Sequence, residues 1–274
     1  MFDAILHPFA WAISYLWVWI HDLLVLLGMS SGSGMAWVLS IVLLTVLVRI
    51  AIIPLFLKQI RSSRAMQAIQ PEMRKIQEKY KGKKDQVSRQ KMMEETQALQ
   101  RKHKVSPFAS CLPILAQMPI FFGLYQVLMS VPTAAQNNQG VLMLPAELVH
   151  QFNDSQIFGA QLFATMMHPG AGDATATVVQ AVIMIVLMSA TQFYIQKQLS
   201  VKNMSEAALN SPMFRQQQMI MYIFPIIFAV SGINFPLGVL YYWTVSNLWS
   251  LGQQWWVIRN NPTPGSQAER ELNA

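Results

Sequence analysis

The chain has 274 residues, of which 53% are hydrophobic and 12% are charged, and its formal net charge at pH 7 is +7. A water-soluble domain usually carries about 25% charged residues. The composition therefore indicates that the solvent is lipid rather than water. Cys111 is the only cysteine, which excludes an internal disulfide and any metal site built from several cysteines.

Residues 1–35 are predicted to form a helix in the membrane interface and a linker. The stretch Phe9–Leu27 is apolar and dense in Trp and Tyr, and the polar pair His21-Asp22 interrupts it. Aromatic side chains favour the interface between lipid and water. A sixth membrane span over the same stretch is the alternative.

Residues 36–258 are predicted to contain a core of five membrane-spanning helices, because a spanning helix needs about 20 mostly apolar residues. The predicted spans are Ala36–Leu57, Pro107–Met129, Ala176–Ile195, Met219–Ser231 and Pro236–Ile258. The fourth is short, which implies tilt or local thinning of the bilayer. The predicted fold class is thus an all-α integral membrane protein.

The Lys and Arg residues are distributed unevenly, and this predicts the topology. Residues 58–106 hold fourteen of the twenty, 197–217 hold three and the tail 259–274 holds two, whereas the loop 131–175 holds none. By the positive-inside rule, the three basic segments are cytoplasmic and the loop 131–175 is extracytoplasmic. The tail is polar and rich in Pro and Gly, so it is predicted to be disordered.

The cytoplasmic segment 58–106 is predicted to be a helical hairpin with a basic turn. Its apolar residues recur at helical spacing, the run Lys81–Asp85 breaks the pattern, and the stretch Val87–Leu99 resumes it. The segment has few aromatic side chains, which argues against stacking on nucleic-acid bases. A solvated basic face beside anionic lipid is the simpler interpretation.

Arg49 is the sharpest functional signal in the sequence. It lies inside the first predicted span, and Lys58 follows nine residues later, which is about 13 Å along a helix. A charge at such depth costs about 2.5–3.5 kcal/mol or more, so its side chain should face protein or water. The predicted spans contain no Asp or Glu that could pair with it. Arg49 is therefore predicted to place a fixed positive charge in a wet cavity, and the alternative is a purely structural Arg.

Uncharged polar side chains on the predicted spans add candidates for a shared hydrophilic groove. Each of them alone is more simply explained as a contact that holds helices together, whereas their combination with Arg49 favours a groove. The candidates are Thr45, Gln117, Gln192, Trp243, Ser246 and Asn247.

The sequence carries no Walker A or HExxH pattern, and the five histidines are scattered. No catalytic residue, metal ligand or cofactor is therefore predicted, and the protein is not expected to be an enzyme.

Several stretches in fixed order resemble the YidC-type membrane protein insertases of bacteria and their mitochondrial and chloroplast relatives. The resemblance runs from about residue 36 to 258. The matching stretches are Val48-Arg49 to Leu55, Ile69-Gln70-Pro71 to Gly82, Lys104-Val105-Ser106-Pro107 to Pro113, Gln117 to Phe121, Tyr194 to Lys197, Phe235 to Trp243, and Val245 to Leu248.

The resemblance implies a five-helix core around a hydrophilic groove that is open to the cytoplasm and to lipid. It implies that Arg49 lies in that groove, with Gln192 and Trp243 among its lining residues, and that the cytoplasmic hairpin is mobile and needed for insertion. It further implies a multi-pass protein of the bacterial inner membrane. The large extracytoplasmic domain of some members of the family is missing from this sequence.

The predicted function is that of a membrane protein insertase and folding chaperone that works without nucleotide hydrolysis. Its expected partners are nascent membrane proteins and the lipid bilayer, with the ribosome and the general translocon as further candidates and no sequence-specific nucleic acid. The alternative is a small-anion transporter or channel that uses Arg49, although transporters usually show internal repeats and this sequence shows none. A structural scaffold would leave Arg49 unexplained.

Overall fold

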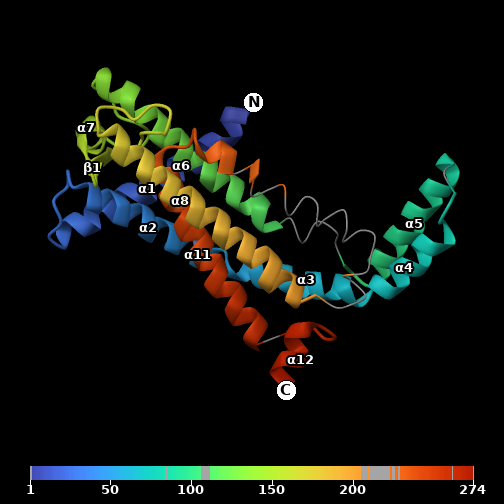
Figure 1. Ribbon diagram of the computed structural model, residues 1–274. Helices are drawn as coiled ribbons and strands as arrows, with labels where there is room; N and C mark the ends of the chain where they lie inside the picture. The colour runs from blue at the N-terminus through green and yellow to red at the C-terminus, as the bar shows by residue number, and fades with distance from the viewer. Residues whose placement is uncertain are drawn as a thin grey trace. The chain divides into compact units, whose positions relative to one another are not determined.

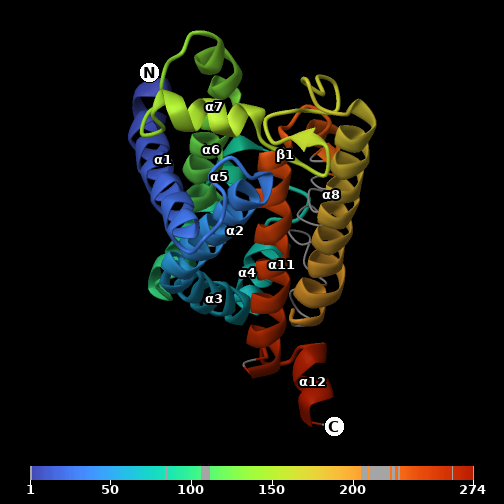
Figure 2. The same cartoon turned by 90° about the vertical axis from the view of Figure 1, so that its left-hand side faces the viewer.

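The computed structural model describes residues 2–83, 85–105, 112–204, 229–260 and 262–273, together with 209, 223, 226 and 227. Figures 1 and 2 show that the described part of the chain is mostly helical. Its elements are α1 (Phe2–Leu26), α2 (Gly34–Ala51), α3 (Ile53–Ala68), α4 (Gln70–Lys79), α5 (Gln86–Lys102), α6 (Leu112–Gln136), α7 (Ala146–Asp154), β1 (Gln156–Ile157), β2 (Ala160–Gln161), α8 (Ala174–Tyr194), the π-helix η2 (Ile195–Ser200), α11 (Leu237–Asn260) and α12 (Gln267–Asn273).

These elements form two compact units. The first unit contains α1, α2, α6 from Leu115 onward, α7, both strands, α8 to Phe193 and α11 to Leu251. The second contains α3, α4, α5, η2, the end of α11 from Gly252 onward and α12. The all-α membrane fold predicted from the composition is confirmed at this level.

Helix α1 belongs to the core of the first unit. Its Trp17 Nε1 donates a hydrogen bond of 2.7 Å to Ser40 Oγ of α2, and its His21 ring stacks on Trp37 with centroids 3.6 Å apart. Phe152 of α7 meets both indoles edge-on. By length and composition, His7–Leu26 qualifies as a membrane span, which is the alternative raised above. The interfacial placement of α1 stays a prediction.

Helix α2 ends at Ala51, six residues before the predicted end of the first span. Ile52 interrupts the helix, and α3 starts at Ile53 with Pro54 in its first turn. Proline lacks an N–H donor, and its ring clashes with the carbonyl four residues earlier. The prediction of one helix from Ala36 to Leu57 was therefore wrong, and Arg49 lies in the last turn of α2.

Four helices among the described residues are long and apolar enough to cross a membrane: His7–Leu26, Gly34–Ala51, Leu115–Gln136 and Ala174–Lys197. Helices α8 and α11 match the third and fifth predicted spans closely. Helix α11 is long but carries many polar side chains, and most of the predicted span 219–231 lies outside the described residues. The exact number of spans in the core stays a prediction.

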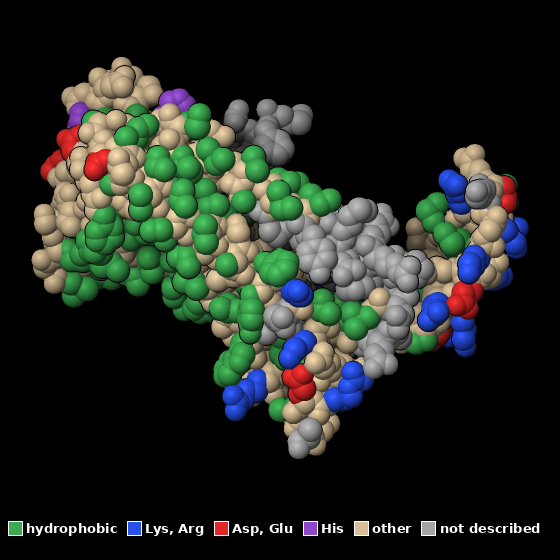
Figure 3. All heavy atoms as spheres, viewed as in Figure 1, with side chains coloured by type: hydrophobic (Ala, Val, Ile, Leu, Met, Phe, Trp, Pro, Cys, Tyr) green, Lys and Arg blue, Asp and Glu red, His purple; other side chains and the backbone are tan. Residues whose placement is uncertain are grey.

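The exposed side chains of α8 suit contact with lipid. Figure 3 shows hydrophobic side chains along this helix. Those at least one-third exposed include Val178, Val179, Val182, Ile183, Val186 and Leu187. An exposed apolar face of this length is expected where acyl chains replace water.

The loop 131–175 is an ordered cap on the first unit, and Figure 2 shows α7 and β1 at the same end of α1, α6 and α8. Helix α6 extends to Gln136, so this loop begins later than predicted. Strands β1 and β2 pair antiparallel across Phe158 and Gly159, whose φ angles of 48° and 84° fit a tight hairpin turn. A Cβ on Gly34 would lie 2.1 Å from the carbonyl oxygen of Gln156. Glycine therefore allows the start of α2 to approach this cap closely.

The second unit contains the predicted helical hairpin. Helices α4 and α5 are joined at Tyr80–Asp85, where Gly82 has a φ of +85°. Lys79 Nζ and Tyr80 OH donate hydrogen bonds of 2.5 and 2.9 Å to Glu95 Oε1 across the pair. Apolar contacts at the base involve buried Ile69, Met73 and Val105. The hairpin and its basic turn were thus predicted correctly.

The tail 259–274 was predicted to be disordered, and that prediction was wrong for most of it. Helix α12 occupies Gln267–Asn273 after a turn in which the Ser266 Oγ accepts a hydrogen bond from Glu269 N. Lys202 Nζ pairs with Glu271 at 3.2 Å, and Thr263 N donates to Asn203 Oδ1 at 2.8 Å. Composition alone could not predict these contacts, because they join residues 69 and 60 positions apart.

Candidate functional site

Arg49 is half-buried in the last turn of α2. Its Nε atom is buried and has no hydrogen-bond partner among the described residues. None of the ion pairs found in the described part of the chain includes Arg49. Among those residues, therefore, no carboxylate pairs with Arg49. The carbonyl dipoles at the end of α2 favour a cation at this position.

Tyr242 of α11 is the neighbour that links Arg49 to other polar groups. The Arg49 guanidinium lies near the Tyr242 phenol, and Tyr242 is 2% exposed. Gln117 Nε2 of α6 donates a hydrogen bond to the Tyr242 hydroxyl. Three helices of the first unit thereby bring a cation, an amide and a phenol together, and we call these three residues with Ser246 the Arg49 cluster.

Ser246 completes the Arg49 cluster one helical turn after Tyr242. Its hydroxyl lies beside that of Tyr242. The Ser246 Oγ is buried, yet it makes no hydrogen bond of good geometry to any described residue. Buried polar atoms without partners are rare in native proteins and call for a functional or solvent-based explanation. The cluster thus holds two buried polar atoms, on Arg49 and Ser246, with unused hydrogen-bonding capacity.

Thr45 and Trp243 were predicted to line the same groove, but their described contacts are with groups outside the Arg49 cluster. Thr45 is buried and donates to the Ile41 carbonyl within α2 at 2.7 Å. The Trp243 indole is half-buried, meets Phe121 edge-on at 5.1 Å and stacks on Phe235 at 6.1 Å. Trp243 therefore belongs to an aromatic cluster between α6 and α11.

The predicted residue Asn247 takes part in the packing of α11 on α8. Asn247 Nδ2 donates to the Met188 carbonyl at 3.2 Å, and Tyr241 OH donates to Gln180 Oε1 at 3.0 Å. These bonds join two helices, which is the structural role that any single polar residue was expected to have. Gln192 lies half-buried one turn after Met188 on α8.

Tyr242 is not among the groove residues predicted from the sequence. Tyrosine in an apolar segment is typical of an aromatic residue at the membrane interface. One signal was available, since Tyr242 and Ser246 are four residues apart and therefore share a helix face.

The Arg49 cluster offers hydrogen bonding and positive charge rather than bond-breaking chemistry. No group of three or more possible metal ligands occurs among the residues that the structure describes. Arg49, Gln117 and Ser246 can donate hydrogen bonds, and the guanidinium attracts anions. This combination suits reversible binding of a carboxylate or of exposed peptide groups.

Comparisons with known proteins agree with this picture. The family model described as "60Kd inner membrane protein" matches residues 28–264. A protein of Streptomyces avermitilis named "Membrane protein insertase YidC" is 48% identical over 87% of this chain and 55% of its own length. A protein of the same name from Tropheryma whipplei is 44% identical over 96% of this chain and 86% of its own length.

A solved structure titled "Active YidC insertase crystal structure with the first transmembrane domain resolved" aligns at a TM-score of 0.47 and 20% identity, over 93% of this chain and 47% of that chain. That similarity is too low to place any residue of this chain. The chain spans about half the length of the Streptomyces relative and most of the Tropheryma relative. The match to the family model covers most of the sequence, and this chain therefore belongs to the 60Kd inner membrane protein family, the family of the YidC insertases.

Proposed function

We propose that this chain is a membrane protein insertase in which the Arg49 cluster receives the polar flank of a nascent hydrophobic segment. The proposal rests on the family membership and on one observation. The guanidinium of Arg49 is partly buried next to Tyr242 and has no acidic partner among the described residues. A cation kept in this state is available for an acidic group on a substrate.

The mechanism follows from the cost of moving polar groups through hydrocarbon. A nascent segment must carry its polar, often acidic, flank across a region where each unpaired polar group costs several kcal/mol. Hydrogen-bonding capacity at Gln117, Tyr242 and Ser246 and positive charge at Arg49 lower that cost for part of the path. The apolar part of the substrate then moves into lipid, driven by about 25 cal/mol per Å² of buried apolar surface.

The proposal includes a groove open to cytoplasm and lipid, with 58–106, 197–217 and the tail in the cytoplasm and 131–175 outside. The asymmetric distribution of Lys and Arg supports this orientation. Nascent membrane proteins and the lipid bilayer are the partners, and the ribosome and the general translocon are further candidates. Nucleotide hydrolysis is not part of this mechanism. The alternative of an anion transporter finds no support in the names of the relatives.

Replacement of Arg49 by Ala tests the proposal. We expect insertion of a substrate with an acidic flank into proteoliposomes to fall about tenfold, which corresponds to about 1.4 kcal/mol of lost stabilisation. Thermal unfolding should not shift to lower temperature, because the change removes a buried donor that lacks a partner. Equal insertion by the wild type and the variant would contradict the role of Arg49.

Arg49→Lys is the matched control because it keeps the positive charge. It should retain most of the insertion activity if charge is what matters. A loss as large as that of Arg49→Ala would instead indicate that the planar guanidinium and its several donors are required.

A further inference from the structure

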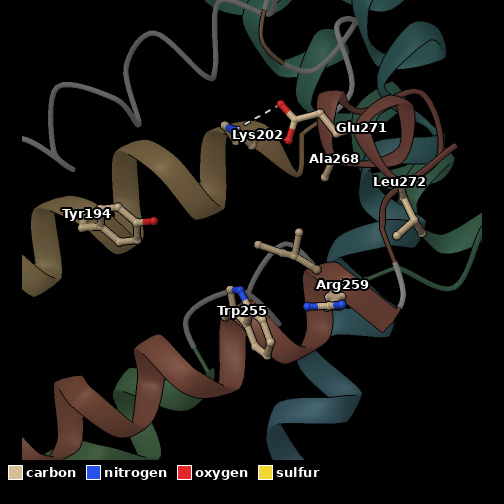
Figure 4. A pocket seen from close by; sticks show the side chains of 8 residues that line it. Tyr194, Lys202, Trp255, Arg259, Ala268, Glu271 and Leu272 are labelled. Carbon is tan, nitrogen blue, oxygen red and sulfur yellow. Dashed lines mark hydrogen bonds and ion pairs between the residues drawn. The ribbon is translucent and has the colours of Figure 1, made fainter. Parts of the chain in front are cut away.

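A pocket of about 300 Å³ lies in the second unit, between the end of α8 with η2, the last turns of α11, and α12. Figure 4 shows that the side chains of Trp255 and Arg259 approach it from α11. Tyr194 and Lys202 contribute from the α8 side, and Glu271 contributes from α12. This pocket is separate from the Arg49 cluster, all of whose residues belong to the first unit.

The pocket carries a net positive charge. Lys202 pairs with Glu271 at 3.2 Å, whereas the Arg259 guanidinium lies over the Trp255 ring at 5.3 Å from its centroid. Arg259 takes part in none of the ion pairs found among the described residues. Two cations therefore face one carboxylate, and the second cation is held in place by an aromatic ring rather than by an acid.

The position of the pocket suits the boundary between hydrocarbon and water. It lies at the ends of two long helices, and the exposed apolar face of α8 continues as far as Phe193 and Tyr194. Trp255 and Tyr194 are 54% and 51% exposed. Tryptophan, tyrosine and basic residues gather where lipid headgroups lie.

We propose that this pocket binds the phosphate group of an anionic phospholipid, with Arg259 and Lys202 as its cationic contacts. A volume of about 300 Å³ suits a headgroup and not a whole lipid. Arginine and lysine are the side chains that most often contact phosphate oxygens.

The same geometry makes Glu271 a competitor within the chain. Its carboxylate accepts hydrogen bonds from Lys202 Nζ when no lipid is bound, with both oxygens within 3.3 Å of Nζ. A phosphate that reaches Lys202 displaces that carboxylate and weakens the docking of α12. Lipid binding and docking of the tail therefore oppose each other.

Native mass spectrometry of the full chain tests this site. The protein in detergent is mixed with phosphatidylglycerol or with phosphatidylcholine of the same acyl chains, and the affinity of the first bound lipid is compared. We expect the wild type to bind phosphatidylglycerol more tightly than phosphatidylcholine. In Arg259→Gln the ratio of the two affinities should fall about fivefold, which corresponds to about 1 kcal/mol for one cation near an anionic surface. Arg270→Gln removes the same charge from α12 outside the pocket and should behave as the wild type.

Glu271→Gln keeps both cations and removes the competitor, so it should bind phosphatidylglycerol more tightly than the wild type. This variant tests the site independently of whether Arg259→Gln folds. Equal losses in Arg259→Gln and Arg270→Gln, or weaker binding by Glu271→Gln, would overturn the site. Displacement of the lipid by an equal concentration of inorganic phosphate would show a free-anion site and overturn the lipid assignment. No nascent chain is present, so the outcome does not depend on insertion.

Discussion

At the scale of single residues, Arg49 and Tyr242 define what is unusual about this molecule. A buried guanidinium normally has a carboxylate neighbour, because an unpaired charge away from water is costly. Here the described neighbour is a phenol, which offers a dipole but no opposite charge. The carbonyl groups at the end of α2 lower the free-energy cost of this shielded positive charge. No carboxylate is needed for that effect, so the charge stays available to a substrate.

Tyr242 and Tyr241 form a matched pair for testing the Arg49 cluster. Each hydroxyl hydrogen-bonds a glutamine, Gln117 and Gln180 respectively, but only Tyr242 neighbours Arg49. We expect Tyr242→Phe and Tyr241→Phe to lower stability similarly, by about 1 kcal/mol each, because each change breaks one hydrogen bond.

Only Tyr242→Phe should also reduce insertion, because it alone removes a polar group beside Arg49. Thermal unfolding and proteoliposome insertion, measured on both variants, separate the two effects. Equal insertion defects in the two variants would indicate that the hydroxyls matter only for helix packing.

Arg49, Gln117 and Ser246 could be proposed from the sequence because charged and polar residues stand out in apolar segments, and the structure brings them together around Tyr242. The sequence could not assign their partners, since contacts among α2, α6 and α11 depend on how the helices pack. Thr45 shows this limit, because its hydroxyl returns to the Ile41 carbonyl of its own helix. Trp243 shows it too, because the described contacts of its indole are with aromatic rings.

At the scale of elements, proline and glycine decide where the helices begin and end. Pro54 and Pro71 stand in the first turns of α3 and α4, where a missing N–H costs little. Hydropathy alone joined the segments on either side of Ile52, because apolar residues occur on both sides of the break. The steric effect of Pro54 on the preceding turn, rather than polarity, ends α2.

The stability of the α4–α5 hairpin should decrease at acidic pH. The hydrogen bond from Lys79, followed by that from Tyr80, lowers the pKa of Glu95 below its ordinary value. A lowered pKa in the folded state stabilises the hairpin above the ordinary carboxyl pKa, and this contribution is lost as the pH falls through the lowered value. Hydrogen-exchange protection of α4, corrected for intrinsic rates, should therefore decrease below about pH 4.

Two glutamine variants provide the control for that dependence on pH. Glu95→Gln should remove the acid-dependent decrease, because it removes the titrating group of the cross-helix contact. Glu94→Gln should keep it, since Glu94 hydrogen-bonds Gln90 within α5. An identical pH profile for Glu95→Gln and the wild type would contradict this assignment.

At the scale of the whole molecule, composition and charge asymmetry were enough to predict a helical membrane protein with a basic hairpin. Contacts between residues far apart in the sequence could not be predicted from composition or charge. The packing of Trp17 and His21 against α2 places α1 in the core of the first unit. The ion pair between Lys202 and Glu271 joins the tail, whose composition indicates disorder, to the residues that follow η2. Both depend on residues that meet only after folding.

The central claim is that the charge of Arg49 acts on the acidic flank of a substrate. A double-mutant cycle in proteoliposomes measures this directly, with the wild type and Arg49→Ala each given one substrate with an acidic flank and the same substrate with its Asp and Glu replaced by Asn and Gln. We expect a large effect of Arg49→Ala on insertion of the acidic substrate and almost none on insertion of the neutral one. Equal fold-losses for the two substrates would contradict this claim.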